Sequence, residues 1–241
     1  MLNKMRKLET LLSSRRFLKN LLEHRVAVGV EHLKVLSSMG RMDVVIDIGA
    51  NKGQFALAAR YQYPGAKIHS FEPLADAALL FRRVFAKDAA VFLYQCAIGP
   101  EVGHVPIHVS GRADSSSLLP ISAAQNATFP GTAEVSQQVI PVKPLSACIS
   151  TADLTGSALL KLDVQGFELQ ALMGCESYLS YFSFVYVECS FVELYVGQAL
   201  AHEVIEWLHQ RGFRLAGVFN MFNNSDGTPV QADFVFGRAL D

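Results

Sequence analysis

The stretch VVIDIGANKG, residues 44–53, joins an apolar run to a glycine-rich turn. The apolar residues before Gly49 favour a buried strand, and the residues from Gln54 onward favour a helix directly after the turn. Gly49 allows a tight turn and close approach of a ligand, and Gly53 opens the helix, where free N–H groups favour an anionic group. This order of strand, turn and helix predicts a fold of the Rossmann type.

Short apolar strands continue to alternate with helices after this stretch. Further strands are predicted at 66–71, 91–98, 158–163, 184–189, 213–219 and 232–236, and helices at 75–85, 167–173 and 200–211. The alternation predicts an α/β fold with a mainly parallel, seven-stranded sheet covered by helices on both faces. An insertion is predicted at about 99–157, where strands at 104–109 and 137–142 flank a polar segment.

Residues 1–40 are predicted to form an N-terminal helical extension before a domain at 41–241. Basic residues outnumber acidic ones in this region: Lys4, Arg6, Lys7, Arg15, Arg16, Lys19 and Arg25 against Glu9 and Glu23. A solvated helix that caps the domain or packs in a homo-oligomer is the favoured interpretation, and peripheral contact with an anionic membrane is the alternative. No transmembrane run or signal peptide is recognised, so a cytoplasmic location is expected.

The composition excludes several classes of function. The chain has 241 residues, 51% of them hydrophobic, which suits one domain with a full core. Its net charge of −1 argues against nucleic acid as a partner, since such proteins usually carry a basic domain. The four cysteines form no C-x-x-C pair, so neither a zinc site nor a disulfide framework is expected.

An acidic residue, Glu72, follows the second predicted strand. In nucleoside-binding Rossmann folds a carboxylate at this place accepts hydrogen bonds from ribose hydroxyls, and a charge at a helix N-terminus is the alternative reading. An NAD enzyme would carry G-x-G-x-x-G, but Asp47 stands where its first glycine should be. The D-x-G form suits a ligand with an amino-acid tail.

Two more carboxylates, Asp163 and Glu188, end the next two core strands. Because neighbouring strand ends meet at one edge of the sheet, this pair could act as a base or hold a cation such as Mg²⁺. Lys161 and Glu168 lie in the same stretch, and their pairing with each other or with nearby backbone is the structural alternative.

Taken together, five segments resemble the FkbM family of methyltransferases. They are residues 45–53, 71–73, 97–99, 115–118 and 160–168, and the resemblance extends over about 43–236. It implies a class I methyltransferase fold, S-adenosylmethionine as donor, and O-methylation of a small-molecule or glycan acceptor. The family often has Glu where this chain has Gln165, so a base or ligand role for that position is in doubt here.

The resemblance and the motifs together assign the site. The cofactor is expected to contact Asp47, Gly49, Asn51, Gly53, Glu72, Ala97 and Asp163. Asp163 and Glu188 are the predicted catalytic residues, with His104, His108 and His202 as further bases, and Ser115 and Ser116 are predicted to bind the acceptor. A non-catalytic cofactor-binding module and an NAD or nucleotide-sugar enzyme remain the alternatives.

Overall fold

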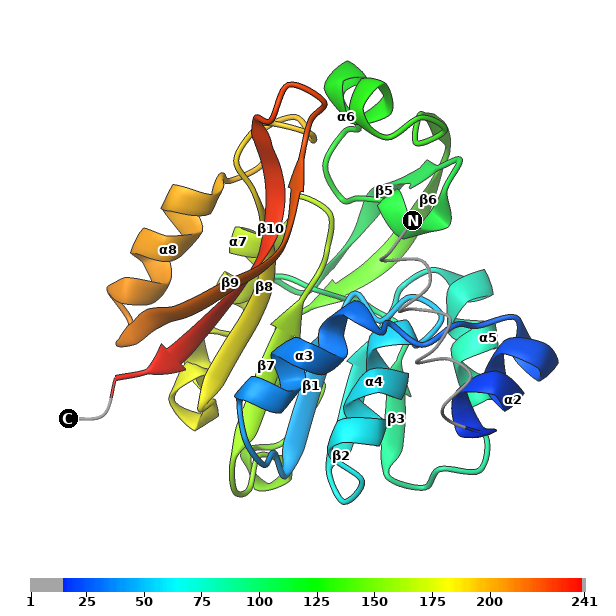
Figure 1. Cartoon of the computed structure of the whole chain (residues 1–241), viewed down its shortest axis with the longest axis vertical. Helices are drawn as coiled ribbons and strands as arrows, with labels where there is room; N and C mark the ends of the chain where they lie inside the picture. The colour runs from blue at the N-terminus through cyan, green and yellow to red at the C-terminus, as the bar shows by residue number, and fades with distance from the viewer. Residues whose placement is uncertain (1–14, 240–241) are drawn as a thin grey trace.

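The computed structural model describes residues 15–239, which form a seven-stranded sheet and a smaller three-stranded one (Figure 1). The large sheet has the order β3-β2-β1-β7-β8-β10-β9. Its strands are β1 (Val44–Ile48), β2 (Lys67–Phe71), β3 (Val91–Tyr94), β7 (Ala158–Leu162), β8 (Phe184–Ser190), β9 (Phe213–Asn223) and β10 (Pro229–Arg238). β10 runs antiparallel to both of its neighbours, β8 and β9, and the other pairs of the sheet are parallel, so the predicted Rossmann-like, mainly parallel sheet is confirmed.

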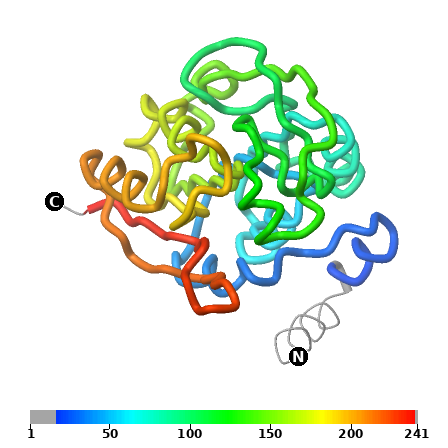
Figure 2. The backbone as a smooth tube through the Cα atoms, turned by 90° about the horizontal axis from the view of Figure 1, so that it is seen from above, coloured from blue at the N-terminus to red at the C-terminus, as the bar shows by residue number. Residues whose placement is uncertain are grey.

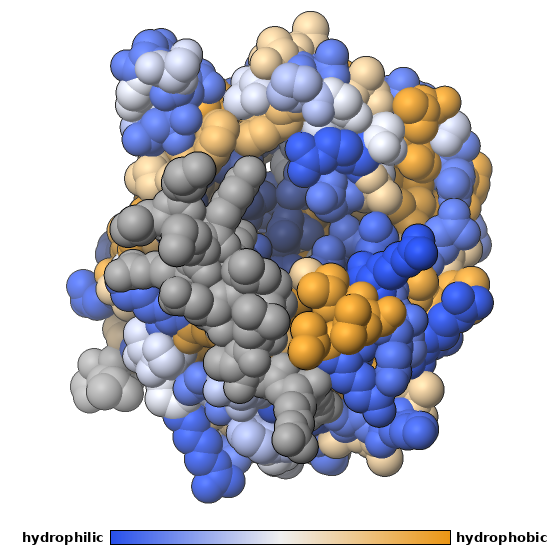
Figure 3. Space-filling model, turned by 45° about the vertical axis from the view of Figure 1, so that its right-hand side comes forward, coloured by the Kyte–Doolittle hydropathy of each residue, from blue (hydrophilic) through white to orange (hydrophobic). Residues whose placement is uncertain are grey.

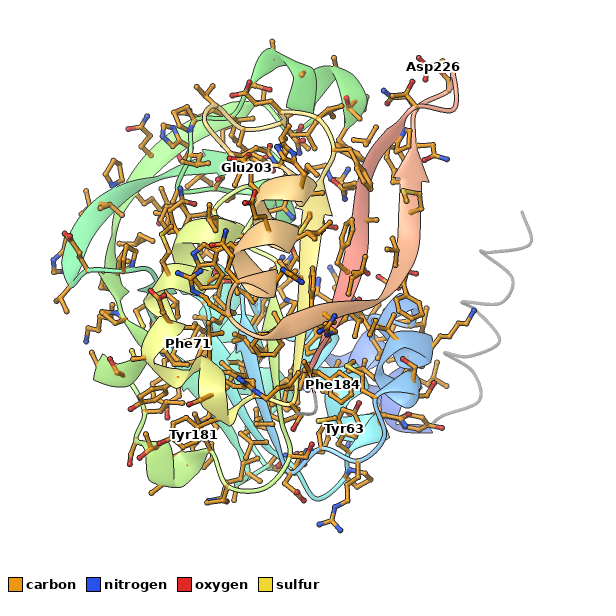
Figure 4. All side chains as sticks on the ribbon, turned by 90° about the vertical axis from the view of Figure 1, so that its left-hand side faces the viewer. Tyr63, Phe71, Tyr181, Phe184, Glu203 and Asp226 are labelled. Carbon is orange, nitrogen blue, oxygen red and sulfur yellow. The ribbon has the colours of Figure 1, made fainter. Side chains whose placement is uncertain are left out.

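Helices cover both faces of the large sheet, as Figures 1 and 4 show from two sides. They are α2 (Arg15–His24), α3 (Glu31–Ser38), α4 (Gln54–Gln62), α5 (Ala75–Val84), α7 (Glu168–Gly174) and α8 (Ala201–His209). Val45 of β1 packs into one core cluster with α3 and α4, whereas Ile46 packs into the other with α7 and α8. Successive strand residues point to opposite faces, so β1 must be apolar on both.

The predicted third strand at 91–98 was wrong in its length, because it divides between the two sheets. β3 pairs with β2 only as far as Tyr94, opposite Phe71, where β2 ends. The chain then bends, and β4 (Ala97–Ile98) pairs with β6 instead. The small sheet has the order β4-β6-β5, with β5 (Gly103–Ser110) and β6 (Glu134–Lys143) antiparallel.

The segment between β5 and β6 lies near the end of the β9–β10 hairpin, as Figures 1 and 2 show from two directions. Its helix α6 (Ala123–Thr128) lies near this end in Figure 1, and Figure 4 labels Asp226 in the hairpin turn. The rings of Phe129 and Phe222 join the two parts, with centroids 4.9 Å apart.

Between residues 15 and 43 the predicted helical extension contains two helices, α2 and α3. α2 packs beside α5, with Phe17 fully buried, and α3 packs on α4. The chain between the two helices, residues 25–30, is irregular. The basic residues Lys4, Arg6 and Lys7 lie outside the described residues, so the membrane and oligomer interpretations of this region stay predictions. Among the helices of residues 15–239, none combines the length and apolar character needed to cross a bilayer.

Candidate functional site

A cavity of about 400 Å³ lies at the carboxyl ends of β1, β2 and β7. Its other walls come from residues 27–32, which precede β1, and from the small sheet with the loop that follows β5. Figure 3 shows a face of the molecule with a hollow whose interior is hydrophilic. The carboxyl edge is where ligands bind in open α/β sheets, so this cavity is the candidate site.

The β1–α4 turn is shaped by two glycines with left-handed backbone. Gly49 has φ 78°, and a Cβ built on it would lie 1.8 Å from the carbonyl oxygen of Asp163, so no side chain fits. Gly53, at φ 94°, begins α4 against Phe81 and Phe85. Asn51 lies between them, lines the cavity and has a buried Oδ1 without a hydrogen-bond partner in the described chain.

Glu72 places a buried carboxylate in the cavity wall. Its oxygens accept hydrogen bonds from the backbone N–H groups of Asn51 (2.9 Å) and Leu74 (2.8 Å). Burial outweighs these bonds and raises the pKa of Glu72 to about 7. Each oxygen keeps a second lone pair, which suits the predicted role of accepting from ribose hydroxyls.

Asp47 does not line the cavity, which corrects its predicted contact with the cofactor. Its side chain is completely buried and pairs with the Nζ of Lys161 at 3.0 Å. Lys161 also donates to the carbonyl oxygen of Gly49 at 3.1 Å. Burial lowers the pKa of Lys161, but Asp47 and Asp163 outweigh it and hold the pKa above its ordinary value. The Asp47–Lys161 ion pair therefore holds the β1–α4 turn in place through the bond to Gly49.

Lys161 consequently does not pair with Glu168, but both bond to nearby backbone, which is the other form of the structural alternative. The Oε1 of Glu168 instead accepts from the N–H groups of Val164 (3.2 Å) and Gly166 (3.0 Å). Glu168 is thereby fixed in the loop between β7 and α7.

Gln165 connects the two predicted catalytic carboxylates. Its Nε2 donates to Asp163 (2.7 Å) and to Glu188 (3.1 Å), and its Oε1 accepts from the hydroxyl of Tyr195 at 2.8 Å. The other oxygen of Glu188 accepts from the amide of Gln231 at 2.9 Å. Burial, then the charge of Asp163, raises the pKa of Glu188 well above its ordinary value.

The two carboxylates therefore differ in their access to the cavity. Asp163 lines it, whereas Glu188 does not, so the structure offers no support for Glu188 as a base. The Gln165 amide lies where a shared cation would have to bind, and residues 15–239 contain no group of three His, Cys, Asp or Glu side chains suited to a metal. A role for Mg²⁺ thus finds no support in the donor set of this region.

The serine run is only partly in the cavity. Ser116 and Ser117 line it, and the hydroxyl of Ser117 donates to the carbonyl oxygen of Gln165 at 2.6 Å. Ser115 does not, because the 3-10 turn at Ala113–Ser115 buries it, and its carbonyl oxygen lies 3.1 Å from the hydroxyl oxygen of Tyr195. The predicted contact of Ser115 with the acceptor is corrected accordingly.

Ala97, at the start of β4, lines the cavity, and its contact with the cofactor stays a prediction, whereas the histidines weighed as bases do not line it. His104 and His202 are exposed, and His108 contacts Glu134 at 2.7 Å. Sequence reasoning missed two polar residues of the cavity wall, His32 and Gln54. The Oε1 of Gln54 is buried without a hydrogen-bond partner in the described chain. Gln54 directly follows the glycine turn, and this adjacency is the signal that could have indicated it.

Restoring the family's residue tests the amide bridge. Gln165→Glu is expected to lower the free energy of unfolding by about 2–4 kcal/mol at about pH 8, because two donated bonds are replaced by a third buried carboxylate. Such a carboxyl has a raised pKa in the folded state, so the loss should shrink as the pH falls toward about 5. Urea titrations at several pH values measure it, with the exposed Gln138→Glu as control. Equal stability of Gln165→Glu and wild type at about pH 8 would contradict the bridge.

Comparison with solved structures agrees with the fold. A precorrin-6y C5,15-methyltransferase from Geobacter metallireducens matches with a TM-score of 0.51 at 10% identity, covering 90% of this chain and 96% of that one. TehB from Haemophilus influenzae matches with a TM-score of 0.51 at 7% identity, covering 93% of this chain and 67% of that one. At such identities the likeness concerns the fold alone.

Proteins with similar sequences indicate which enzyme family the chain belongs to. 2-O-methyltransferase NoeI of Sinorhizobium fredii is 29% identical over 189 residues, 73% of this chain and 76% of that protein. The 31-O-demethyl-FK506 methyltransferase FkbM of Streptomyces tacrolimicus is 30% identical over 157 residues, 56% of this chain and 60% of that protein. The methyltransferase FkbM domain itself matches residues 47–215. This chain therefore belongs to the FkbM family of S-adenosylmethionine-dependent methyltransferases.

Proposed function

We propose that the protein transfers a methyl group from S-adenosylmethionine to a hydroxyl oxygen of a sugar or glycan-type acceptor. The observation that carries the cofactor assignment is a set of buried oxygens on residues of one cavity wall: the carboxylate of Glu72 and the unpartnered amide oxygens of Asn51 and Gln54. The names of two relatives, a 2-O-methyltransferase and a 31-O-demethyl-FK506 methyltransferase, support oxygen as the methylated atom.

These oxygens fit the cofactor by their chemistry. A buried acceptor without a donor costs free energy, and a ligand rich in donors removes that cost. The ribose hydroxyls and the amine of S-adenosylmethionine are such donors, so Glu72 would hold the ribose and Asn51 and Gln54 the other polar groups. Gly49 and Ala97 line the cavity beside them and have no side chain or only a methyl group. Gly53 does not line it, because a Cβ there would lie 2.7 Å from Phe85, so its predicted contact with the cofactor is not part of the proposal.

The cavity also offers polar groups for an acceptor. Ser116, Ser117 and Asp163 line it, and hydroxyl-rich molecules bind well to hydroxyl and carboxylate groups. S-Adenosylmethionine, when bound, supplies a methyl group on a positively charged sulfur. The chain's own contribution is alignment of the acceptor hydroxyl, which can supply roughly 7–11 kcal/mol in well-oriented reactions. Asp163 is proposed to orient that hydroxyl or the cofactor's amine.

Calorimetric titration with S-adenosylhomocysteine tests the cofactor part. Wild type is expected to bind it and not NAD, and Glu72→Ala should weaken binding at least about tenfold, or 1.4 kcal/mol. Glu101→Ala, an exposed carboxylate in the turn before β5, is the matched control and should bind as wild type does. Binding of NAD in place of S-adenosylhomocysteine would overturn the proposal. Labelled methyl transfer to a panel of sugars then tests the acceptor class.

The affinity should depend on pH through Glu72. Its carboxyl has a pKa of about 7 before binding, and hydroxyl donors stabilise the charged form, so binding should release a proton. The affinity for S-adenosylhomocysteine is therefore expected to fall below about pH 7, by at most about tenfold per pH unit. Titrations in buffers of different ionisation enthalpy measure the release, and Glu72→Gln should flatten the profile. A profile of wild type that is flat from about pH 5 to 8 would contradict this role.

A further inference from the structure

A histidine that no motif indicated, His32, lies in the cavity wall formed by residues 27–32. We propose, on the basis of the function proposed above, that His32 is the general base that removes the proton of the acceptor hydroxyl through Nε2. Tyr186 and Asp233 are then positioning residues, which fix the ring and its tautomer without contact with the acceptor.

Three side chains from distant parts of the chain form one hydrogen-bonded series. The Nδ1 of His32 lies 2.7 Å from the hydroxyl oxygen of Tyr186, and that hydroxyl donates to the carboxylate of Asp233 at 2.6 Å. The amide of Asn220 donates to the same carboxylate oxygen at 2.7 Å. A tyrosine has a single hydroxyl proton, so a hydroxyl that donates to Asp233 can only accept from His32.

This arrangement fixes the tautomer of the imidazole. Nδ1 carries the proton, and Nε2 keeps its lone pair. Within residues 15–239, Nε2 makes no hydrogen bond. Burial raises the pKa of Tyr186 well above its ordinary value, so its hydroxyl keeps its proton at neutral pH. A histidine whose Nδ1–H is held by a buried acceptor, so that its second nitrogen stays free, has the geometry of a general base.

The ring is held in place by packing. It contacts the edges of Phe55 and Tyr186, with centroids 5.2 and 5.7 Å away. Gly29 leaves room for it, since a Cβ at this position would lie 2.6 Å from Cδ2 and 3.2 Å from Nε2 of His32. The absence of a side chain at Gly29 therefore allows the ring to occupy this part of the wall.

The position of His32 along the sheet separates it from the proposed ribose site. Glu72 follows β2, whereas Tyr186 and Asp233 belong to β8 and β10, on the other side of β1 and β7 in the strand order. A cofactor whose ribose is held by Glu72 would have to extend across β1 and β7 toward His32. The base thus lies at the end of the cavity that the ribose does not occupy.

The charges around His32 suit a base at neutral pH. They come from every neighbouring element: Glu31 of α3, Asp233 of β10, Lys161 of β7 and Asp163 of the loop that follows it. Burial lowers the pKa of His32 below its ordinary value of 6.5, while Asp233 acts in the opposite direction. The ring is accordingly neutral at pH 7, and the nearby carboxylate favours the imidazolium that forms during the reaction.

The proton and the electrons balance in a single displacement. The acceptor oxygen forms a bond to the methyl carbon while the bond between that carbon and the sulfonium breaks, and its electron pair stays on sulfur. Nε2 takes the hydroxyl proton, and the imidazolium releases it to water afterwards. Asp163 is less suited to this task, because it accepts from Gln165 at 2.7 Å and lies 4.0 Å from the Lys161 ammonium.

Nitrogen NMR of histidine-labelled protein with bound S-adenosylhomocysteine tests the geometry without any acceptor. His32 is expected to show a protonated Nδ1, a free Nε2 and a pKa below 6.5. Asp233→Asn should lower that pKa further, since the carboxylate raises it, and Tyr186→Phe should shift the tautomer toward protonated Nε2. The exposed Asp226→Asn and Tyr181→Phe are matched controls that should change neither. A proton on Nε2 in wild type, or a pKa indifferent to Asp233→Asn, would overturn the proposal.

Methyl transfer to a sugar from the panel gives the kinetic test. His32→Gln should slow transfer by about 10²–10⁴-fold while the Kd of S-adenosylhomocysteine stays within about threefold. Tyr186→Phe should slow it less, and Asp233→Asn should move the acidic limb of the pH–rate profile to lower pH. Transfer by His32→Gln at the wild-type rate would exclude the base. If wild type methylates no sugar, the proposed acceptor class fails, while the NMR result still decides the state of His32.

Discussion

Lys161→Met is expected to lower the free energy of unfolding by about 3–5 kcal/mol, because it leaves the Asp47 carboxylate buried without its cation. The Asp47 side chain is completely inaccessible and that of Lys161 is 4% exposed, so the carboxylate depends on its partner for compensation of its charge. The carbonyl of Gly49 loses its donor as well. Urea unfolding followed by circular dichroism measures the loss.

Two controls separate the buried pair from the general cost of the substitution. Lys67→Met changes an exposed lysine of β2 and should alter the stability by less than about 0.5 kcal/mol. Asp47→Asn combined with Lys161→Met removes the unpaired charge and should recover part of the loss. If the double variant is no more stable than Lys161→Met alone, the cost does not come from an uncompensated carboxylate.

Gly49→Ala is expected to cost about 2–5 kcal/mol and to abolish measurable binding of S-adenosylhomocysteine. The left-handed backbone accounts for about 1–2 kcal/mol of this loss, and the clash of the new methyl group with the Asp163 carbonyl accounts for the rest. To relieve the clash, the ends of β1 and β7 must separate, which moves Asn51 and Asp163 in the cavity wall. Calorimetry and urea unfolding on the same sample measure both effects.

Gly40→Ala provides a closely matched control for this substitution. Gly40 has φ 72°, close to the 78° of Gly49, but nothing lies within 4 Å of the Cβ that it would gain. It should therefore show the backbone cost alone and bind S-adenosylhomocysteine normally. Equal losses of unfolding free energy in the two variants would mean that the clash with the Asp163 carbonyl does not contribute to the cost of Gly49→Ala.

The sequence was sufficient for most of the sheet and for part of the cavity wall, because these depend on local patterns. An apolar run before Gly49 and a carboxylate after the second strand are adjacent to the elements that position them. The prediction for the third strand was wrong because its end depends on where β2 stops, and β2 is a partner in space. No property of residues 91–98 marks that point.

The polar contacts were harder to predict because each depends on a partner far along the chain. Asp47 was identified from the sequence as a cofactor contact. In the structure its carboxylate instead pairs with Lys161, 114 positions later in the chain. His32 stands 154 positions from Tyr186, in a region that the sequence predicts only as a helical extension before the domain, so no local pattern indicated that it forms a cavity wall. Gln165 was noted for its lost charge, whereas its two donated hydrogen bonds follow only from the folded loop.

The wall formed by residues 27–32 has a consequence for any shortened version of this enzyme. The methyltransferase FkbM domain matches residues 47–215, yet His32 precedes that interval and Asp233 follows it. A fragment cut to those limits would keep the glycine turn and Glu72 while losing β10, which lies between β8 and β9. The part of the chain that matches the family is therefore shorter than the part that forms and supports the cavity wall. The ends of an expressed fragment should be chosen so that every residue of that wall is included.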